Sequence, residues 1–419
     1  MAKTKAPPSN AFTDLLIESL NKKSLGTNAY LQGDLGKHTY GVPIPYLAAI
    51  YLLGGMNVLP ISRYFGVSGE EKSFKSTLQV EFGNWFLMAG GMHLLLDPEQ
   101  KTSATMLDAM TWWDDRIPPD RRIYKACRSI DEWQVQVTTA IKIMRAQGPV
   151  PKGQRVPVYI VVDGMTSKGT ESQMANLEKE GEAAERGYPV AAAKTTYFLE
   201  SLNLLGTTCA VGWVQHMKAE IEQDSYGGTK YKEKGAKASQ FACSTHLRVT
   251  KWSGGLNFAE FPGAPSPSTP VTGYELYVKC VRSSVGESDH SLILPVLWQH
   301  IPQESGETRQ AMWFDWYGAL GALLLSMKYN DKHKPRALYA QEKAALAEVV
   351  DFSQPHVGKV TCKKYGLEDA LATEFGRAIE NDPETRAKLA KFFHVATYAN
   401  VQDVDIDWAA GDLIEKKKK

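Results

Sequence analysis

Short apolar runs separated by longer polar stretches dominate the sequence from residue 41 to about residue 300. Each run is typical of a β-strand, and the set comprises PISRYFGV, MHLLLD, VPVYIVVD, TTCAVGWVQ, THLRVTKW, YELYVKCV and SLILPVLW. Helical patterns separate the earlier runs; one helix face carries Leu78, Phe82, Trp85, Phe86 and Ala89. Strands that alternate with helices predict an α/β fold with a mostly parallel sheet flanked by helices.

The later runs lie too close together for long helices, so we expect THLRVTKW, YELYVKCV and SLILPVLW to extend the sheet in antiparallel fashion. The stretch FPGAPSPSTPVTG between two of them predicts a surface loop. ALYAQEKAALAEVV and DPETRAKLAKFFHVAT consist of good helix formers, and AFTDLLIESL near the N-terminus has helical apolar spacing. We therefore expect an N-terminal arm over 1–40, a core over 41–300 and a mainly helical C-terminal lobe over 301–419.

Composition narrows the class of protein. With 43% hydrophobic and 23% charged residues in a chain of 419, the sequence is that of a globular protein. The formal net charge of +1 gives no global attraction to a polyanion, so any basic surface must be local. Five cysteines without a CxxC pair favour neither disulfides nor a cysteine zinc site. The basic N-terminus and the short apolar runs indicate a soluble, cytoplasmic protein without a membrane partner.

The stretch YFGVSGEEKSFKSTLQV follows a predicted strand and opens a predicted helix, which is the setting of a phosphate-binding P-loop. The pattern Gly-x-x-x-x-Gly-Lys-Ser/Thr fits in two frames. One begins at Gly66 and ends in the Lys-Ser pair 72–73, and the other begins at Gly69 and ends in the pair 75–76. Both frames lack the second glycine.

The residue that replaces this glycine separates the two frames. Glu71 in the first frame would repel a phosphate, whereas Phe74 in the second can turn away while its backbone N–H faces the anion. We therefore prefer the Gly69 frame, in which Lys75 reaches the β- and γ-phosphates and the Ser76 hydroxyl binds Mg²⁺. The predicted nucleotide-binding residues of this turn are Gly69, Glu70, Glu71, Lys72, Ser73, Phe74, Lys75, Ser76 and Thr77.

Three later strands also end in polar side chains. HLLLDPEQ carries Asp97 and Glu99, VPVYIVVDG carries Asp163, and CAVGWVQ ends in Gln215. An apolar strand that ends in Asp is the Walker B form, whose carboxylate orders Mg²⁺. Each carboxylate taken alone is also explained as a loop residue or helix cap, but their succession after a P-loop favours a nucleotide site.

The chain at this point resembles RecA-type recombinases, most closely the phage UvsX branch, over about residues 41–298. GEEKSFKS resembles the UvsX phosphate loop, which also has Phe-Lys-Ser where RecA has Gly-Lys-Thr. LLLDPEQ, VVDG, WVQHMK and VKCVRSS resemble further segments of the family. The resemblance implies a RecA-like P-loop ATPase core with an N-terminal oligomerisation arm.

The resemblance also assigns roles to single residues. Glu99 takes the role of the catalytic glutamate, Asp163 that of the Walker B carboxylate, and Gln215 that of the residue that couples nucleotide state to DNA binding. Arg282, and less firmly Lys279, would reach the ATP of a neighbouring subunit. One departure is Met106, which stands where the family commonly has a tyrosine that stacks on adenine.

Two loops would face DNA according to the same resemblance. The first, MTSKGTESQMANLEKEGEAAERGY, follows Asp163, and the second lies within DSYGGTKYKEKGAKASQFACSTHLRV. Lysines neutralise phosphates and aromatic rings stack on bases, although a solvated lysine-rich loop is the simpler interpretation without the resemblance. The predicted DNA contacts are Lys230, Tyr231, Lys232, Lys234, Gly235 and Lys237.

The expected function is that of an ATP- and Mg²⁺-dependent recombinase. It would form helical filaments on single-stranded DNA and exchange strands with homologous duplex DNA, together with a loader or single-strand-binding protein, in the bacterial host cell if it is phage-encoded. Two alternatives remain: a hexameric RecA-fold helicase, and a filament-forming DNA-coating scaffold with little ATPase activity, which the missing P-loop glycine and Met106 favour.

Overall fold

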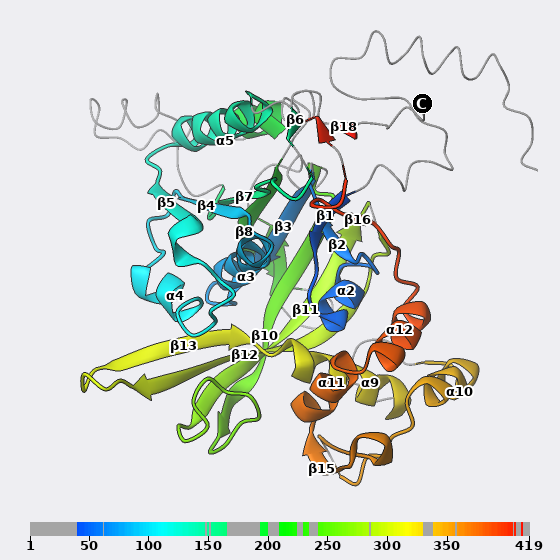
Figure 1. Cartoon of the computed structure of the whole chain (residues 1–419). Helices are drawn as coiled ribbons and strands as arrows, with labels where there is room; N and C mark the ends of the chain where they lie inside the picture. Colours follow the sequence, from blue (N-terminus) through cyan, green and yellow to red (C-terminus); the bar gives the residue numbers. More distant parts are fainter. Residues whose placement is uncertain are drawn as a thin grey trace, which may run out of the picture.

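A sheet of ten strands forms the centre of the molecule (Figure 1). Its strands follow the order β13-β12-β11-β10-β3-β8-β7-β4-β5, and β9 pairs with β8 off this path. This computed structural model describes residues 40–61, 63–146, 149–150, 152–165, 193–199, 209–223, 229–233, 242–284, 286–329, 338–356, 358–404, 406–407 and 412–413. The sheet strands are β3 (Tyr64–Gly69), β4 (Met92–Asp97), β5 (Arg122–Ala126), β7 (Val158–Val162), β8 (Ala210–Gln223), β9 (Thr229–Glu233), β10 (Thr245–Phe258), β11 (Val271–Ser283), β12 (Ser291–Pro302) and β13 (Thr308–Phe314).

The sheet is mixed, with a parallel half and an antiparallel half. The pairs from β5 through β4, β7, β8 and β3 to β10 are parallel. The pairs from β10 through β11 and β12 to β13 are antiparallel. The predicted parallel region and the antiparallel addition of β11 and β12 are therefore confirmed.

The prediction for β10 was wrong, because β10 runs parallel to β3. The reason lies in β8, which pairs antiparallel with β9 in a hairpin. Strand β9 runs back along β8, and β10 then begins beside β3, with Thr245 opposite Phe65. A strand can thus join the sheet in parallel although no helical crossover was visible in the sequence.

Helix α3 (Lys75–Met88) connects β3 with β4 and is buried along most of its length. It lies against the parallel half of the sheet, and α5 (Ile130–Ala146) lies near the end of this half (Figure 1). The predicted helix is confirmed, and Leu78, Phe82, Trp85 and Phe86 are buried, but so is most of the rest of α3, and Ala89 lies just after the helix. The remaining elements of this part are α2 (Leu47–Leu52), α4 (Ala104–Ala109) and the 3-10 turn η2 (Pro119–Arg121).

The C-terminal region is mainly helical, but its start differs from the expected boundary at residue 300. That boundary falls inside β12, and the sheet continues through β13 because the apolar positions of Thr308–Phe314 pair with β12. The helices that follow are α9 (Trp316–Tyr329), α10 (Ala340–Val349), α11 (Ala372–Glu380) and α12 (Pro383–Phe392). Between them lie β14 (Lys359–Cys362), the 3-10 turn η4 (Lys363–Tyr365) and β15 (Leu367–Leu371).

The C-terminal helices pack onto the rest of the protein through a continuous apolar core. Phe375, Ile379 and Leu389 belong to the same buried cluster as the residues of β3 and α3. Beyond α12, β16 (Ala399–Asn400) pairs in parallel with β1 (Tyr40–Pro43), which also pairs with β2 (Val58–Pro60). A further small sheet contains β6 (Pro149–Val150), β17 (Ile406–Asp407) and β18 (Asp412–Leu413).

Two other sequence-based expectations concern the arm and the membrane. The predicted arm lies outside the described residues except for Tyr40, the first residue of β1. None of the helices in the described ranges is both long and apolar enough to span a bilayer.

Candidate functional site

The carboxyl ends of β3, β4 and β7 lie at one edge of the sheet, where β8 passes between β3 and β7 and continues beyond it. Gly69 at the end of β3 lies opposite His216 of β8, and Leu96 of β4 lies opposite Val162 of β7. Ligands of open α/β sheets bind at the carboxyl ends of the strands. The acidic residue 163 directly follows β7, so the predicted P-loop and the predicted Walker B carboxylate lie at this common edge.

The turn between β3 and α3 spans residues 70–74, and its backbone conformation bears on the predicted anion binding. Lys72 and Phe74 are both left-handed, with φ of 60°, and N–H groups in such turns can form a concave anion-binding site. Phe74 is the N-cap of α3 and makes no side-chain cap, so its side chain leaves the first N–H groups of the helix to other acceptors.

These boundaries match the Gly69 frame. Gly69 ends β3 and Lys75 begins α3, as a P-loop between a strand and a helix requires. Gly66 lies inside β3, opposite Trp213 of β8, and Lys72 precedes the helix. Glu71 and Lys72 are exposed.

Lys75 is held inside the turn by short polar contacts. Its ammonium donates to the backbone carbonyl of Glu70 and, at 3.3 Å, to the hydroxyl of Ser73. The Ser73 hydroxyl in turn donates to the same carbonyl at 2.8 Å. Burial lowers the pKa of Lys75, so an anion next to the ammonium would stabilise its charged form.

Ser76 and Asp163 form the second part of the site. The Ser76 hydroxyl donates to Oδ1 of Asp163 at 2.9 Å, and Thr102 donates to Oδ2 at 3.4 Å. Burial raises the pKa of Asp163 to about 6, against the opposing effect of the Ser76 bond. The serine at the start of α3 and the carboxylate after β7 are therefore brought together, as the sequence predicts for a shared Mg²⁺ site.

Asp97 organises the turn that follows β4. It is fully buried and accepts hydrogen bonds from the backbone N–H groups of Gln100 at 2.7 Å and Thr102 at 2.8 Å. Tyr124 of β5 donates to the same carboxylate at 3.2 Å. Since Glu99 lies within this turn, Asp97 fixes the backbone from which Glu99 projects.

Glu99 lies between two cationic or potentially cationic side chains. Its Oε1 is 2.7 Å from Nε2 of His216 and its Oε2 is 3.0 Å from the ammonium of Lys101. Burial acts to raise the pKa of Glu99, but the bonds to His216 and Lys101 outweigh it and lower the pKa to about 2. Glu99 is therefore a carboxylate at neutral pH.

Gly164 makes room for this glutamate. A Cβ atom at residue 164 would lie 2.4 Å from Cγ of Glu99, and its φ of +85° is unfavourable for any other residue. The glycine of the VVDG segment thus allows Glu99 to cross the backbone that follows Asp163.

His216 is a site residue that the sequence analysis missed. The predicted residue is its neighbour Gln215, which is buried and lies opposite Ser68 of β3. Successive residues of a strand point to opposite faces, so a shift by one residue exchanges the two side chains. The polar pair Gln215–His216 at the strand end was the only signal for the histidine.

The two predicted nucleotide contacts on β11, Lys279 and Arg282, are level with residues of β3 that come before Gly69. Lys279 pairs with Arg248 of β10, and Arg248 pairs with Ser68 of β3. Lys279 is therefore level with Ser68, the residue before Gly69. Arg282 is opposite His246, which lies in the row of Gly66. Lys279 forms an ion pair of 2.9 Å with Asp289. Their predicted role concerns a neighbouring subunit, so it stays a prediction.

The predicted DNA-contacting residues fall in two groups. Lys230, Tyr231 and Lys232 belong to β9, in which Tyr231 pairs with Ala219 and Lys232 with Lys218 of β8. This part of the expected loop is therefore a β-hairpin. Lys234, Gly235 and Lys237, and most of the loop after Asp163, lie outside the described residues.

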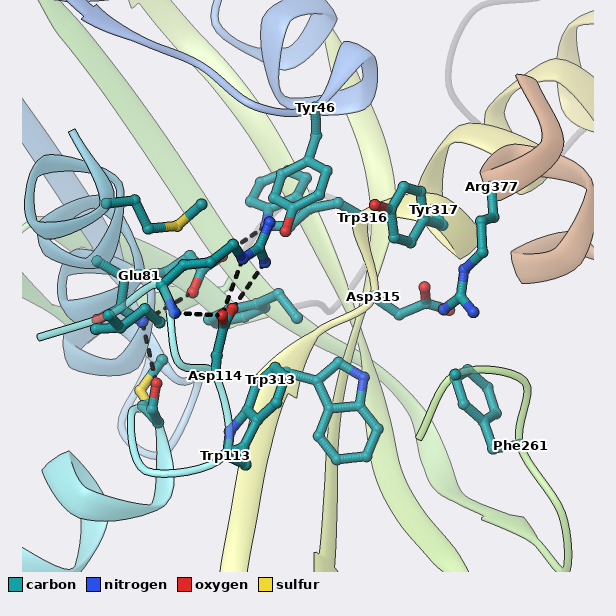
Figure 2. A pocket seen from close by; sticks show the side chains of 17 residues that line it. Tyr46, Glu81, Trp113, Asp114, Phe261, Trp313, Asp315, Trp316, Tyr317 and Arg377 are labelled. Carbon is teal, nitrogen blue, oxygen red and sulfur yellow. Dashed lines mark hydrogen bonds and ion pairs between the residues drawn. The ribbon is translucent and has the colours of Figure 1, made fainter. Parts of the chain in front are cut away.

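A second charged region is a cavity of about 250 Å³ beside α9 (Figure 2). Its walls come from segments far apart in the sequence and include the aromatic side chains Tyr46, Trp113, Phe261, Trp313, Phe314, Trp316 and Tyr317. Figure 2 shows Glu81 and Asp114 toward one end and Asp315 and Arg377 toward the other. None of the nucleotide- or DNA-binding residues predicted from the sequence lines this cavity.

The carboxylates of this cavity have partners within the protein. Glu81 accepts N–H bonds from Trp316 at 3.0 Å, Trp85 at 3.2 Å and Asn84 at 3.3 Å. Arg116 binds Asp114 through two bonds of 2.9 and 2.7 Å.

At the other end, Asp315 accepts from the Thr373 hydroxyl at 2.7 Å and from the Gly318 N–H at 2.8 Å. Arg377 donates to the Pro262 carbonyl at 3.2 Å and lies over the ring of Tyr317. Such internal compensation is typical of charges buried for structural reasons.

Ser76 and Asp163 are the residues at this edge of the sheet that could hold a metal ion. Within the described ranges, no three His, Cys, Asp or Glu side chains converge as a ready metal site. Mg²⁺ commonly takes one or two protein oxygens and completes its shell with phosphates and water. The hydroxyl of Ser76 and the carboxylate of Asp163, 2.9 Å apart, suit that role.

Comparisons with models of protein families and with curated proteins found no match to this chain.

Proposed function

We propose that this protein is an ATP-dependent DNA strand-exchange protein with a RecA-like core. The observation that carries the proposal is the convergence of Lys75, Ser76, Asp163 and Glu99 at the carboxyl edge of the parallel strands. A lysine and a serine at a helix start, a buried carboxylate and a second, ionised carboxylate are the parts that phosphoryl transfer to water requires.

The turn 70–74 and Lys75 would hold the β- and γ-phosphates of ATP. Backbone N–H groups at the start of α3 would add their partial positive charge. Ser76 and Asp163 would hold Mg²⁺, which when bound neutralises charge on the phosphates. The lowered pKa of Lys75 supports this assignment, because a bound triphosphate would replace the stabilisation of charge that burial removes.

Glu99 would act on the attacking water. Because its pKa is about 2, it is ionised and can accept a hydrogen bond from water near neutral pH. The water oxygen would bond to the γ-phosphorus as the bond to the bridging oxygen breaks, which gives ADP and phosphate. His216 and Lys101 orient the carboxylate, and Asp97 fixes its turn.

The DNA-binding and filament parts of the proposal are supported by position. Strand β8 passes Gly69 with His216 and continues into the β8–β9 hairpin, which bears Lys230 and Lys232. A change at the Glu99–His216 contact would therefore occur on the same strand that leads into the hairpin. We propose single-stranded DNA and homologous duplex DNA as partners, with subunits arranged so that Arg282 approaches a neighbour's nucleotide.

Electron microscopy and phosphate release test this function against its alternatives. Protein incubated with single-stranded DNA, ATP and Mg²⁺ should form helical filaments, and phosphate release should increase when DNA is added. Closed rings would favour a hexameric helicase. Filaments without DNA-stimulated phosphate release would favour a DNA-coating scaffold.

A further inference from the structure

Phe74 occupies a backbone conformation that normally favours glycine. Its φ is 60° and its ψ is 25°, in the left-handed region, where a side chain crowds the backbone. The residue is the last one before α3 and stands where the P-loop pattern has its second glycine. Something outside the backbone must therefore favour this conformation.

The Phe74 ring packs on two aromatic side chains of the antiparallel half of the sheet. Its centroid is 6.1 Å from that of Tyr274 on β11 and 6.4 Å from that of Trp298 on β12, with an interplanar angle of 26° to the indole. Tyr274 and Trp298 lie 5.5 Å apart. These separations are within the range of favourable aromatic pairs.

The platform under Phe74 is itself built from three strands. Tyr274 pairs with Val296 of β12 on one side and with Gly255 of β10 on the other. The ammonium of Lys251 lies 3.3 Å from the Tyr274 ring centroid, a cation–π contact that further fixes the ring. The platform is thus part of the sheet and is independent of the turn that it supports.

Lys72 provides an internal comparison. It has the same φ of 60°, but its side chain is exposed, whereas Phe74 is partly buried against the core. Of the two left-handed residues in the turn, only Phe74 is thus fixed by packing at the helix start, next to Lys75.

We propose that Phe74 is a positioning residue whose ring, packed against Tyr274 and Trp298, holds the turn 70–74 in its phosphate-binding shape. Glycine provides this shape through backbone freedom, whereas here side-chain packing selects it. The inference rests on the proposed function for the identity of the ligand, ATP. It also implies that the turn is coupled to β11 and β12, because its anchor lies on those strands.

The test uses Trp298→Leu and Tyr274→Leu, with Trp252→Leu as the matched control. Trp298 and Tyr274 are only partly buried, so leucine can be accommodated there, and the exposed Trp252 stacks on Tyr277 outside this cluster. The readouts are amide hydrogen exchange of residues 70–76 without nucleotide, and the affinity and kcat for MgATP. We expect each platform variant to accelerate exchange and weaken affinity by roughly three- to tenfold, with kcat at saturation and the control unchanged.

Phe74→Gly completes the design. Glycine accepts the left-handed backbone but removes the ring, so Phe74→Gly should weaken affinity as Trp298→Leu does, and the double variant should be no weaker than either. Multiplied effects in the double variant, or wild-type exchange and affinity in Trp298→Leu, would overturn the inference. If the wild-type chain binds no ATP, the proposed function fails, while exchange of the turn amides still decides whether the platform holds the turn.

Discussion

The turn after β3 and the cavity beside α9 both gather buried charged side chains, but they treat those charges differently. In the cavity, Asp114 is matched by Arg116, and Glu81 accepts three N–H bonds. At the turn, Lys75 donates to a backbone carbonyl and a hydroxyl, and Asp163 accepts from two hydroxyls. Glu81, like Lys75 and Asp163, is thus held by neutral groups, whereas Asp114 has a cation as its partner. The two regions differ in the kind of partner: N–H donors hold the cavity carboxylates Glu81 and Asp114, whereas hydroxyls hold Asp163.

This contrast separates structural charge from functional charge. Helix α3 belongs to both regions, since it begins at Lys75 and carries Glu81 toward the cavity. An N–H group can only donate to its carboxylate, whereas a hydroxyl can rotate and accept as well as donate, so Lys75 and Asp163 can exchange these partners for a ligand. The comparison predicts that substitutions at the turn alter ligand binding and turnover, and that substitutions at the cavity alter stability.

The largest effect is expected for Lys75→Ala. Loss of the buried ammonium removes a charge-assisted contact to phosphate, so phosphate release should fall by at least about 10²-fold. Lys72→Ala is the matched control and should cost less than about tenfold, because Lys72 is exposed and precedes the helix. Nucleotide affinity and phosphate release measure both. An inactive Lys72→Ala with an active Lys75→Ala would show that the Gly66 frame is the right one.

Glu81→Gln tests the cavity side of the comparison. The new amide keeps one acceptor oxygen, so its N–H₂ group would face either the indole N–H groups of Trp316 and Trp85, which both donate to Oε1, or the Asn84 amide, which donates to Oε2. We expect the free energy of unfolding to fall by about 1–3 kcal/mol with little change in ATP affinity. Urea denaturation and nucleotide titration measure the two quantities, and Glu71→Gln on the surface serves as the control. A folded Glu81→Gln protein that no longer binds ATP would break the distinction between the regions.

Asp163→Asn should increase stability while it reduces turnover. Burial raises the pKa of Asp163 to about 6 in the folded protein, above its ordinary 3.8. The proton thus favours folding below about pH 4, and this contribution is lost as the pH rises through 6. At pH 7.5 the amide should raise the free energy of unfolding of the nucleotide-free protein by about 1–3 kcal/mol.

Urea denaturation between pH 4 and pH 7.5 checks this sign. The gain from Asp163→Asn should shrink to zero at the acid end. A gain that is the same at every pH would mean that the buried charge is not its source.

The smallest effect concerns His216. Its removal takes one of two partners from Glu99, so the pKa of Glu99 should rise from about 2 toward its usual range. The acid limb of the pH–rate profile should then move to higher pH in His216→Ala, with turnover at pH 7 reduced about several-fold. His216→Gln keeps a donor and should restore most of the activity. Identical profiles for wild type and His216→Ala would contradict the contact's role.

The sequence predicts the site best where a single segment determines the geometry. The run MHLLLD coincides with β4, and the Ser76–Asp163 contact follows from a helix start and a strand end. The preference for Phe74 over Glu71 rested on a ring that can turn away, and the ring does pack on the sheet. In these cases the pattern of one segment and its position in the sequence are enough to predict the geometry of the site.

Features that depend on distant segments were not predictable in this way. The parallel direction of β10 is determined by its pairing with the distant strand β3, and the contact to Glu99 depends on which face of β8 carries His216. The cavity joins residues as far apart as Tyr46 and Arg377. Only the tertiary arrangement brings such residues together.

Strand exchange is the measurement that tests the proposed function most directly. Circular single-stranded DNA and a homologous linear duplex are mixed with the protein and Mg²⁺, with and without ATP, and a heterologous duplex serves as the control. We expect joint molecules and exchanged product only with ATP and homology, and none with Lys75→Ala. Binding of single-stranded DNA without any exchanged product, or exchange that is equal without ATP, would contradict the account.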